Sequence, residues 1–230
     1  MKRRPQDWPL AVVFDLDGTL IDSAADLANA LNYALGVRKL APFPLAQVKE
    51  MVGGGIPKLV ERALLAHGVT DVELLPLAAD FVKYYRDNLT LRTAPYEGAV
   101  ELLESLKGQG RRLGLCTNKQ HELTVQIVRQ LGIEKYFGAI LGERDGHPRK
   151  PEPGPLLDVL EALGVPPRDA AMVGDSGADV ECAKAAGVLP IVVRYGYSRV
   201  NPEELGASAI IDRLLDLPEC LAKLRPVEQH

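Results

Sequence analysis

The fold class of this 230-residue chain can be inferred from residues 10–20, which read Leu10-Ala11-Val12-Val13-Phe14-Asp15-Leu16-Asp17-Gly18-Thr19-Leu20. The first five of these residues form a short, continuous apolar run rich in β-forming side chains, which predicts a strand buried on both faces. Asp15 and Asp17 follow directly. The carboxyl ends of strands are where open α/β sheets bind their ligands, so this stretch predicts both a buried parallel sheet and a site at its edge.

The pattern becomes helical from about residue 23 to residue 91. Leu27, Leu31 and Leu35 recur every four residues, as they do on the buried face of a helix. Three consecutive glycines, 53 to 55, interrupt the pattern before the next helix, and no strand pattern occurs in this region. We therefore predict a small helical cap domain, inserted after the first strand and placed above the ligand crevice as a lid.

After Pro95, short apolar strands alternate with amphipathic helices. The strands are expected near residues 113–116, 139–141, 171–173 and 191–193. This alternation is typical of β-α units and a parallel sheet. The predicted fold class is α/β, with a doubly wound, Rossmann-like core and the inserted cap. The predicted division is core over residues 1–22, cap over 23–91 and core again over 92–230.

Composition excludes several classes of function. The net charge is -4, with 47% hydrophobic and 25% charged residues, and no basic stripe suggests nucleic acid as a partner. No apolar stretch is long enough to cross a membrane, and the first residues do not form a signal peptide. The three cysteines are scattered and match no metal-binding spacing, which favours reduced thiols and a cytoplasmic protein. The sequence leaves a monomer and a homodimer equally open.

Four short segments carry candidate chemistry, and each follows a predicted strand or lies just beyond one. They are Asp15 with Asp17, Thr117-Asn118, Lys150, and Asp175 with Asp179. Paired carboxylates repel each other unless a cation lies between them, and Mg2+ is commonly bound by one or two carboxylates plus phosphate oxygens. A hydroxyl, an amide and a lysine can hold phosphate oxygens. Because strand ends of one sheet meet at one crevice, we expect these residues to form one site.

Each segment also has an ordinary structural interpretation. Asp-x-Asp-Gly is common in turns and also begins calcium-binding loops, although the other ligands of such a loop are missing here. Thr117-Asn118 and residues 174–179 could simply begin helices, and Lys150 could be a solvated surface residue. Residues 174–178 also come close to a serine-hydrolase elbow, but Ala178 replaces the second glycine. The joint occurrence of all four segments in order favours the functional interpretation.

These motifs resemble those of the haloacid dehalogenase-like superfamily of phosphotransferases, in the same order and over the whole chain. Within that superfamily, the sequence is most similar to the bacterial phosphoglycolate phosphatases. The local similarities lie in residues 52–55, 61–64, 95–99 and 194–197.

The resemblance implies a role for each core residue. Asp15 attacks phosphorus and becomes a phospho-aspartate, while Asp17 protonates the leaving alcohol and then deprotonates water. Mg2+ is held by Asp15, by the backbone carbonyl of Asp17 and by Asp175. Asp179 supports this shell. Thr117, Asn118 and Lys150 hold the phosphoryl oxygens.

In the cap, Gly54 and Gly55 could let backbone amides approach a substrate carboxylate, or could form a plain loop between helices. Arg62 is a candidate substrate contact, with a solvated or salt-bridged arginine as the alternative.

The expected function is Mg2+-dependent hydrolysis of a small phosphorylated metabolite, with 2-phosphoglycolate as the named substrate. Another small phosphate ester and a phosphosugar mutase reaction are the alternatives within the superfamily. A dehalogenase would lack the second carboxylate, so Asp17 argues against it. From a different class, a non-catalytic phospho-acceptor signalling module uses similar residues on a parallel sheet. Such modules have no inserted lid, so the helical stretch from residue 23 to 91 counts against that reading.

Overall fold

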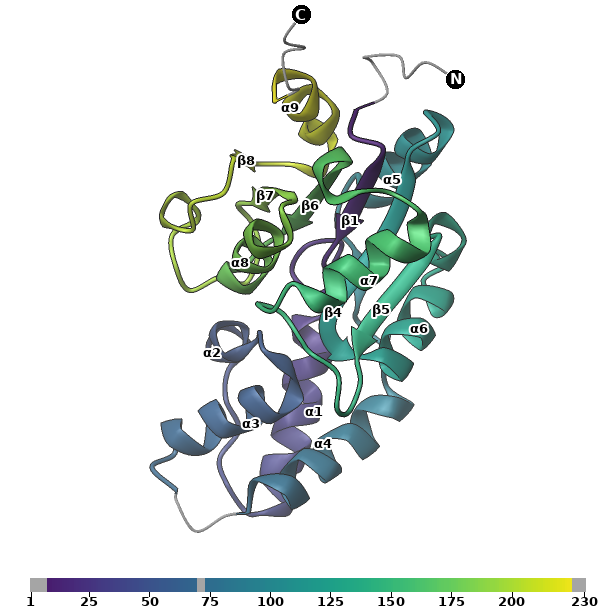
Figure 1. Cartoon of the computed structure of the whole chain (residues 1–230). Helices are drawn as coiled ribbons and strands as arrows, with labels where there is room; N and C mark the ends of the chain where they lie inside the picture. Colours follow the sequence, from purple (N-terminus) through teal and green to yellow (C-terminus); the bar gives the residue numbers. More distant parts are fainter. Residues whose placement is uncertain (1–7, 70–72, 225–230) are drawn as a thin grey trace, which may run out of the picture.

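The computed structural model describes residues 8–69 and 73–224, and its centre is a six-stranded sheet (Figure 1). All neighbouring strands are parallel, in the order β5-β4-β1-β6-β7-β8. The strands are β1 (Ala11–Phe14), β4 (Arg112–Gln120), β5 (Ala139–Glu143), β6 (Ala170–Gly174), β7 (Leu189–Val193) and β8 (Ala209–Ile211). The apolar run after Pro9 therefore forms a central strand, and the prediction of a parallel α/β core is confirmed.

The side chains of β1 alternate between two hydrophobic cores, one on each face of the sheet. Val12 and Phe14 join the core that contains the apolar residues of α5, α6 and α9. Ala11 and Val13 join the core formed with α7 and α8. These helices are α5 (Ala99–Gly108), α6 (His121–Gln130), α7 (Gly154–Leu163), α8 (Gly177–Ala186) and α9 (Leu217–Lys223). Helices on both faces explain why β1 is a continuous apolar run and not an alternating one.

Four further helices lie together at one end of the sheet, away from α9 (Figure 1). They are α1 (Ala24–Val37), α2 (Leu45–Met51), α3 (Gly55–Ala66) and α4 (Leu74–Asp87). Leu27, Leu31 and Leu35 are buried, as their spacing predicts, and α1 packs along α4. Phe81 and Tyr85 of α4 are also fully buried. No strand occurs between α1 and α4 in the described residues of this segment.

The connection between the helical segment and the sheet differs from the prediction. We expected the sheet to resume near residue 93. The first strand there, β3 (Ala94–Pro95), instead pairs antiparallel with β2 (Ile21–Asp22), and the six-stranded sheet resumes only at β4. The chain enters and leaves the cap through these two short strands, which are tied side by side. Strand β8 was missed, although its apolar run is as long as the runs that predicted β5, β6 and β7.

Within the described residues, no helix has both the length and the apolar character needed to cross a lipid bilayer.

Candidate active site

The sequence-predicted core residues meet at the carboxyl ends of β1, β4 and β6. Asp15 follows β1 directly and Asp175 follows β6, while Thr117 and Asn118 lie within β4. Lys150 is in the loop after β5 and is only 4% exposed. One cavity of about 460 Å3 is lined by these five residues. The expectation that separate strand ends build one site therefore matches the geometry.

Lys150 is the centre of the polar network. Its Nζ donates to Oδ1 of Asp15 at 2.7 Å, to Oδ1 of Asp179 at 2.6 Å and to the carbonyl oxygen of Cys116 at 2.8 Å. These three acceptors use all three protons of the ammonium group. The sequence alternative of a solvated lysine is therefore wrong, and Lys150 is fixed against the predicted nucleophile.

Asp179 is almost fully engaged in hydrogen bonds. While Oδ1 accepts from Lys150, Oδ2 accepts from the backbone N–H and the hydroxyl of Ser176 and from the backbone N–H of Asp175. Gly174 packs so closely that an added Cβ would lie 2.4 Å from Cβ of Asp179. Asp179 thus caps the start of α8 and, from the same carboxylate, orients Lys150.

Asp175 is held by close backbone approach. Its Oδ2 accepts from the backbone N–H of Tyr197 at 2.6 Å. A Cβ on Gly196 would lie 2.1 Å from Cβ of Asp175, and one on Gly18 would lie 2.5 Å from its Oδ2. Gly18 also has φ +81°, a region that favours glycine. Only glycine fits at these two positions while Asp175 keeps its place.

Three buried carboxylates and one lysine form this cluster. Oxygen atoms of Asp15, Asp175 and Asp179 lie within 4.8 Å of one another. Among the ion pairs of the described residues, Lys150 contacts Asp15 and Asp179, and none reaches Asp175. A set of hard oxygen donors with more negative than positive charge fits Mg2+. The residues present therefore suit the predicted metal.

Burial and mutual repulsion shift the protonation of this cluster. Burial, opposed by Lys150 and reinforced by Asp179, raises the pKa of Asp15 to about 6. Burial and the neighbouring carboxylates Asp179 and Asp15 raise the pKa of Asp175 well above its ordinary value. Burial alone lowers the pKa of Lys150, but Asp15 and Asp179 outweigh it and hold that pKa well above its ordinary value. A cation beside Asp15 and Asp175 would offset the repulsion between the carboxylates, which contributes to these raised pKa values.

Asn118 has a partner that the sequence did not predict. Its side-chain Nδ2 donates to the carbonyl oxygen of Lys150 at 2.8 Å, and its Oδ1 accepts from the Lys150 N–H at 3.0 Å. The side-chain amide therefore fixes the backbone of Lys150. Thr117 faces the cavity, where its Oγ1 also accepts from the Lys119 N–H at 3.3 Å.

Asp17 has contacts that sequence reasoning missed. Its carboxylate accepts from Oγ of Ser23 at 2.5 Å and from Nζ of Lys119 at 3.1 and 3.2 Å. A signal for Lys119 was present, because alternate residues of a strand point to the same side, and Thr117 and Lys119 are two apart. Tyr197 was also missed, although its segment, residues 194–197, contributed to the resemblance.

The cap contributes one wall of the same cavity. Gly53, Gly54 and Gly55 all have positive φ values, and all three line the cavity together with Arg62. Gly55 lies close to the core, since an added Cβ would be 3.0 Å from Oε2 of Glu143. The loop between α2 and α3 is thus a left-handed turn that only glycines adopt easily, set against the strand ends.

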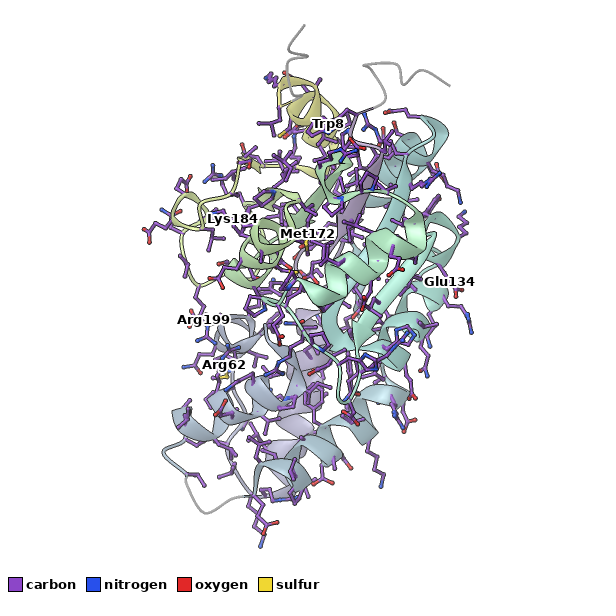
Figure 2. The ribbon with its side chains drawn as sticks, in the orientation of Figure 1. Trp8, Arg62, Glu134, Met172, Lys184 and Arg199 are labelled. Carbon is purple, nitrogen blue, oxygen red and sulfur yellow. The ribbon has the colours of Figure 1, made fainter. Side chains whose placement is uncertain are left out.

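Arg62 lies beside a second arginine, Arg199, on the loop that follows β7 (Figure 2). Arg62 donates to the carbonyl oxygens of Met51 and Gly53 at 2.8 and 2.6 Å, and Arg199 donates to that of Glu50. Burial, followed by repulsion from Arg199, lowers the pKa of Arg62. Neither guanidinium has an acidic partner among the described ion pairs. Arg62 is partly exposed and bonds to backbone carbonyls, so its role as a substrate contact and the solvated alternative both stay predictions.

Comparison with known proteins defines the class. A family model described as haloacid dehalogenase-like hydrolase matches residues 12–193. The chain belongs to this family, which confirms the resemblance.

Several relatives with high sequence similarity share one name. A Rhodospirillum rubrum protein named phosphoglycolate phosphatase is 41% identical over 95% of this chain and 93% of its own length. A Neisseria gonorrhoeae protein of the same name is 40% identical, over 94% and 93%. A crystal structure of a predicted phosphoglycolate phosphatase from Haemophilus somnus superposes with a TM-score of 0.85 at 30% identity, covering 92% of this chain and 97% of that one. These findings confirm the prediction of an enzyme of the phosphatase type over a non-catalytic signalling module.

Proposed function

We propose that this protein is a Mg2+-dependent phosphomonoester hydrolase that works through a phospho-aspartate on Asp15. One observation carries the proposal: the Asp15 carboxylate opens on the cavity with the Lys150 ammonium 2.7 Å from its Oδ1 and two further buried carboxylates beside it. An anionic nucleophile can approach an anionic phosphate only where positive charge is already fixed in place. Lys150 supplies part of that charge.

The reaction has two balanced steps. An Asp15 oxygen forms a bond to phosphorus while the bond from phosphorus to the ester oxygen breaks, and Asp17 gives a proton to the departing oxygen. Asp17, now a carboxylate, takes a proton from water as the water oxygen attacks phosphorus. The bond between phosphorus and Asp15 then breaks, which releases phosphate. Thr117 holds a phosphoryl oxygen in both steps. Lys150 offsets the phosphoryl charge, and donates to a phosphoryl oxygen when the phosphate displaces its hydrogen bond to Asp15. Asn118 keeps the Lys150 backbone in place.

Mg2+ belongs beside the three buried aspartates. Asp15 and Asp175 would hold it together with the backbone carbonyl of Asp17, and Asp179 would support the shell through Lys150 and Ser176. When bound, the ion offsets the charge repulsion between Asp15 and the phosphate.

The proposed substrate is 2-phosphoglycolate, a small ester that carries a carboxylate. Arg62 and Arg199 present two guanidinium groups to the cavity, and Gly54 and Gly55 allow close approach of backbone to a ligand. A carboxylate beside the two arginines would relieve their mutual repulsion. The names of the two bacterial relatives support the same substrate.

The proposed setting is the cytoplasm. Cys116, Cys182 and Cys220 are all free, and two of them are buried, which suits a reducing compartment.

The test is initial phosphate release from a panel of small esters, with Mg2+ and with a chelator. We expect preference for 2-phosphoglycolate, lost on chelation and in Asp15→Asn. Mg2+-dependent turnover of a different ester would keep the mechanism and discard the substrate. Phosphosugar isomerisation with a bisphosphate primer, without phosphate release, would favour the mutase. Absence of any turnover would refute the proposal.

The carboxylate contact is tested with a matched pair of substrates. In 2-hydroxyethyl phosphate, a neutral CH2OH group replaces the carboxylate of 2-phosphoglycolate. Arg62→Met should raise KM for 2-phosphoglycolate by about 10-fold or more and leave KM for the neutral ester nearly unchanged. Arg86→Met is the control, because Arg86 is exposed on α4 and pairs with Glu122 outside this cavity. Equal effects on both esters would remove Arg62 from carboxylate recognition.

A further inference from the structure

A second buried lysine lies at the site without a role in the chemistry described so far. Among the described residues, the buried lysines are Lys119, 7% exposed, and Lys150, 4% exposed. Nζ of Lys119 contacts both oxygens of Asp17, at 3.2 and 3.1 Å. The pair is shielded, with side-chain exposures of 4% for Lys119 and 15% for Asp17. Removing one partner of a shielded ion pair is far more costly than removing one partner of a surface pair.

The other side of Lys119 is closed by the cap. Its Nζ donates to the hydroxyl oxygen of Tyr85 at 2.9 Å and lies 4.7 Å from the centre of the Tyr85 ring. Tyr85 belongs to α4 and is fully buried. Burial, partly offset by Lys119, raises the pKa of Tyr85 to about 12, so the hydroxyl stays neutral. The ammonium group is thus held between a carboxylate of the core and a phenol of the cap.

The Asp17 carboxylate is fixed from two directions. Ser23, directly before α1, donates its hydroxyl to Oδ1 at 2.5 Å, and Lys119 reaches both oxygens from β4. These contacts orient a carboxylate that must reach first the ester oxygen and then a water molecule. Proton transfer needs hydrogen-bonding distance to each, and a displacement of about 1 Å can cost about 100-fold in rate.

We propose that Lys119, backed by Tyr85 of the cap, is the positioning residue for Asp17. The inference rests on the proposed acid and base role of Asp17. Lys119 itself donates no proton to substrate; it sets where the Asp17 carboxylate stands. Tyr85 connects Lys119 to the cap helix α4. The Asp17 carboxylate therefore takes its working position only when α4 lies against the core.

The test separates proton transfer from phosphate binding by the choice of leaving group. Nitrophenolate leaves without a proton, whereas the alcohol released from 2-phosphoglycolate needs one. Lys119→Met should lower kcat for 2-phosphoglycolate by about 100-fold, with KM changed less than about twofold. With p-nitrophenyl phosphate it should show a burst of about one nitrophenolate per active site at close to the wild-type rate, followed by slow turnover, because water activation still needs Asp17.

Tyr85→Phe provides a second variant that keeps the buried ring. It should show the same pattern with a loss of about 2- to 10-fold in kcat. Tyr136→Phe is the matched control, since Tyr136 is also buried and donates to a carboxylate, that of Glu104, outside the cavity. It should leave kcat and the burst unchanged.

Asp17→Asn is the benchmark for both variants. A slow burst in Lys119→Met beside a fast burst in Asp17→Asn would overturn the inference, because Lys119 would then act on the phosphate or on the fold. Unchanged kinetics in Lys119→Met and Tyr85→Phe would also overturn it. Wild-type turnover in Asp17→Asn would refute the proposed role of Asp17 itself and the inference with it.

Discussion

Asp15→Asn should produce a protein that is inactive and more stable than the wild type when metal is removed. Asp15 is 8% exposed and shares its surroundings with two other carboxylates. Burial is the main cause that raises the pKa of Asp15 from 3.8 to about 6, and repulsion from Asp179 adds to it. This value already includes the attraction of Lys150, which acts in the opposite direction. The ionised form is therefore unfavourable in the folded protein. Asparagine resembles the protonated acid and does not ionise.

The raised pKa of Asp15 also sets the size of the stability difference and the pH range in which it develops. Between pH 3.8 and about 6 the folded wild type binds a proton that the unfolded chain has lost, so its stability falls as the pH rises through this range. The total is about 3 kcal/mol, reached above pH 6. Asp15→Asn does not lose stability in this pH range, because asparagine does not ionise. The variant should be about 3 kcal/mol more stable than the wild type at pH 8 and nearly equal to it at pH 3.5, provided that both are folded there.

Urea unfolding with a chelator measures the difference directly. At about 2–3 kcal/mol per molar urea, the midpoint of Asp15→Asn should be about 1 M higher at pH 8. Saturating Mg2+ should reduce or reverse the gap, because the ion stabilises the wild type by about 2.7 kcal/mol at 100 times its Kd and has lost a charged ligand in the variant. A variant that is equal to or less stable than the wild type at pH 8 without metal would refute the reasoning.

Three further predictions concern the neighbouring residues. Asp17→Asn should lower Mg2+-dependent kcat by about 10²- to 10⁴-fold, and a rate near that of the wild type would exclude Asp17 as acid and base. Asp175→Asn should abolish the rise in Tm that Mg2+ gives the wild type; a full rise would place the ion elsewhere. Gly196→Ala should cost about 1–3 kcal/mol in urea unfolding because its Cβ would overlap Asp175. Gly36→Ala, whose Cβ meets no atom within 4 Å, should be neutral or slightly stabilising, and equal effects of the two would contradict the packing argument.

Several local features were predictable because the signal lies within a few residues. The apolar run from residue 10 to residue 14 predicts β1, and all four residues of Ala11–Phe14 are buried. The four-residue spacing of Leu27, Leu31 and Leu35 marks α1 for the same reason. The pairing of β2 with β3 could not be predicted, since two-residue strands are too short to show a periodic pattern.

The composition of the core site was also predictable, since parallel strands bring their carboxyl ends to one edge. This rule needs only the order of strands and motifs. It places Asp15, Thr117, Lys150 and Asp175 together without any knowledge of distance. The rule does not predict hydrogen-bond partners. The sequence therefore suggested that the Asn118 side chain contacts phosphate, and gave no sign of its hydrogen bonds to the Lys150 backbone.

The fold class and the inserted helices could be inferred from the amino-acid sequence alone, because periodicity and the order of strands are local properties. Only the tertiary structure decided which residues touch. Asp17 and Lys119 are 102 positions apart, and Lys119 and Tyr85 are 34 apart on different elements. The first contact depends on the pairing of β1 with β4, and the second depends on how α4 of the cap packs near β4. That packing involves many side chains at once, and no short stretch of sequence encodes it.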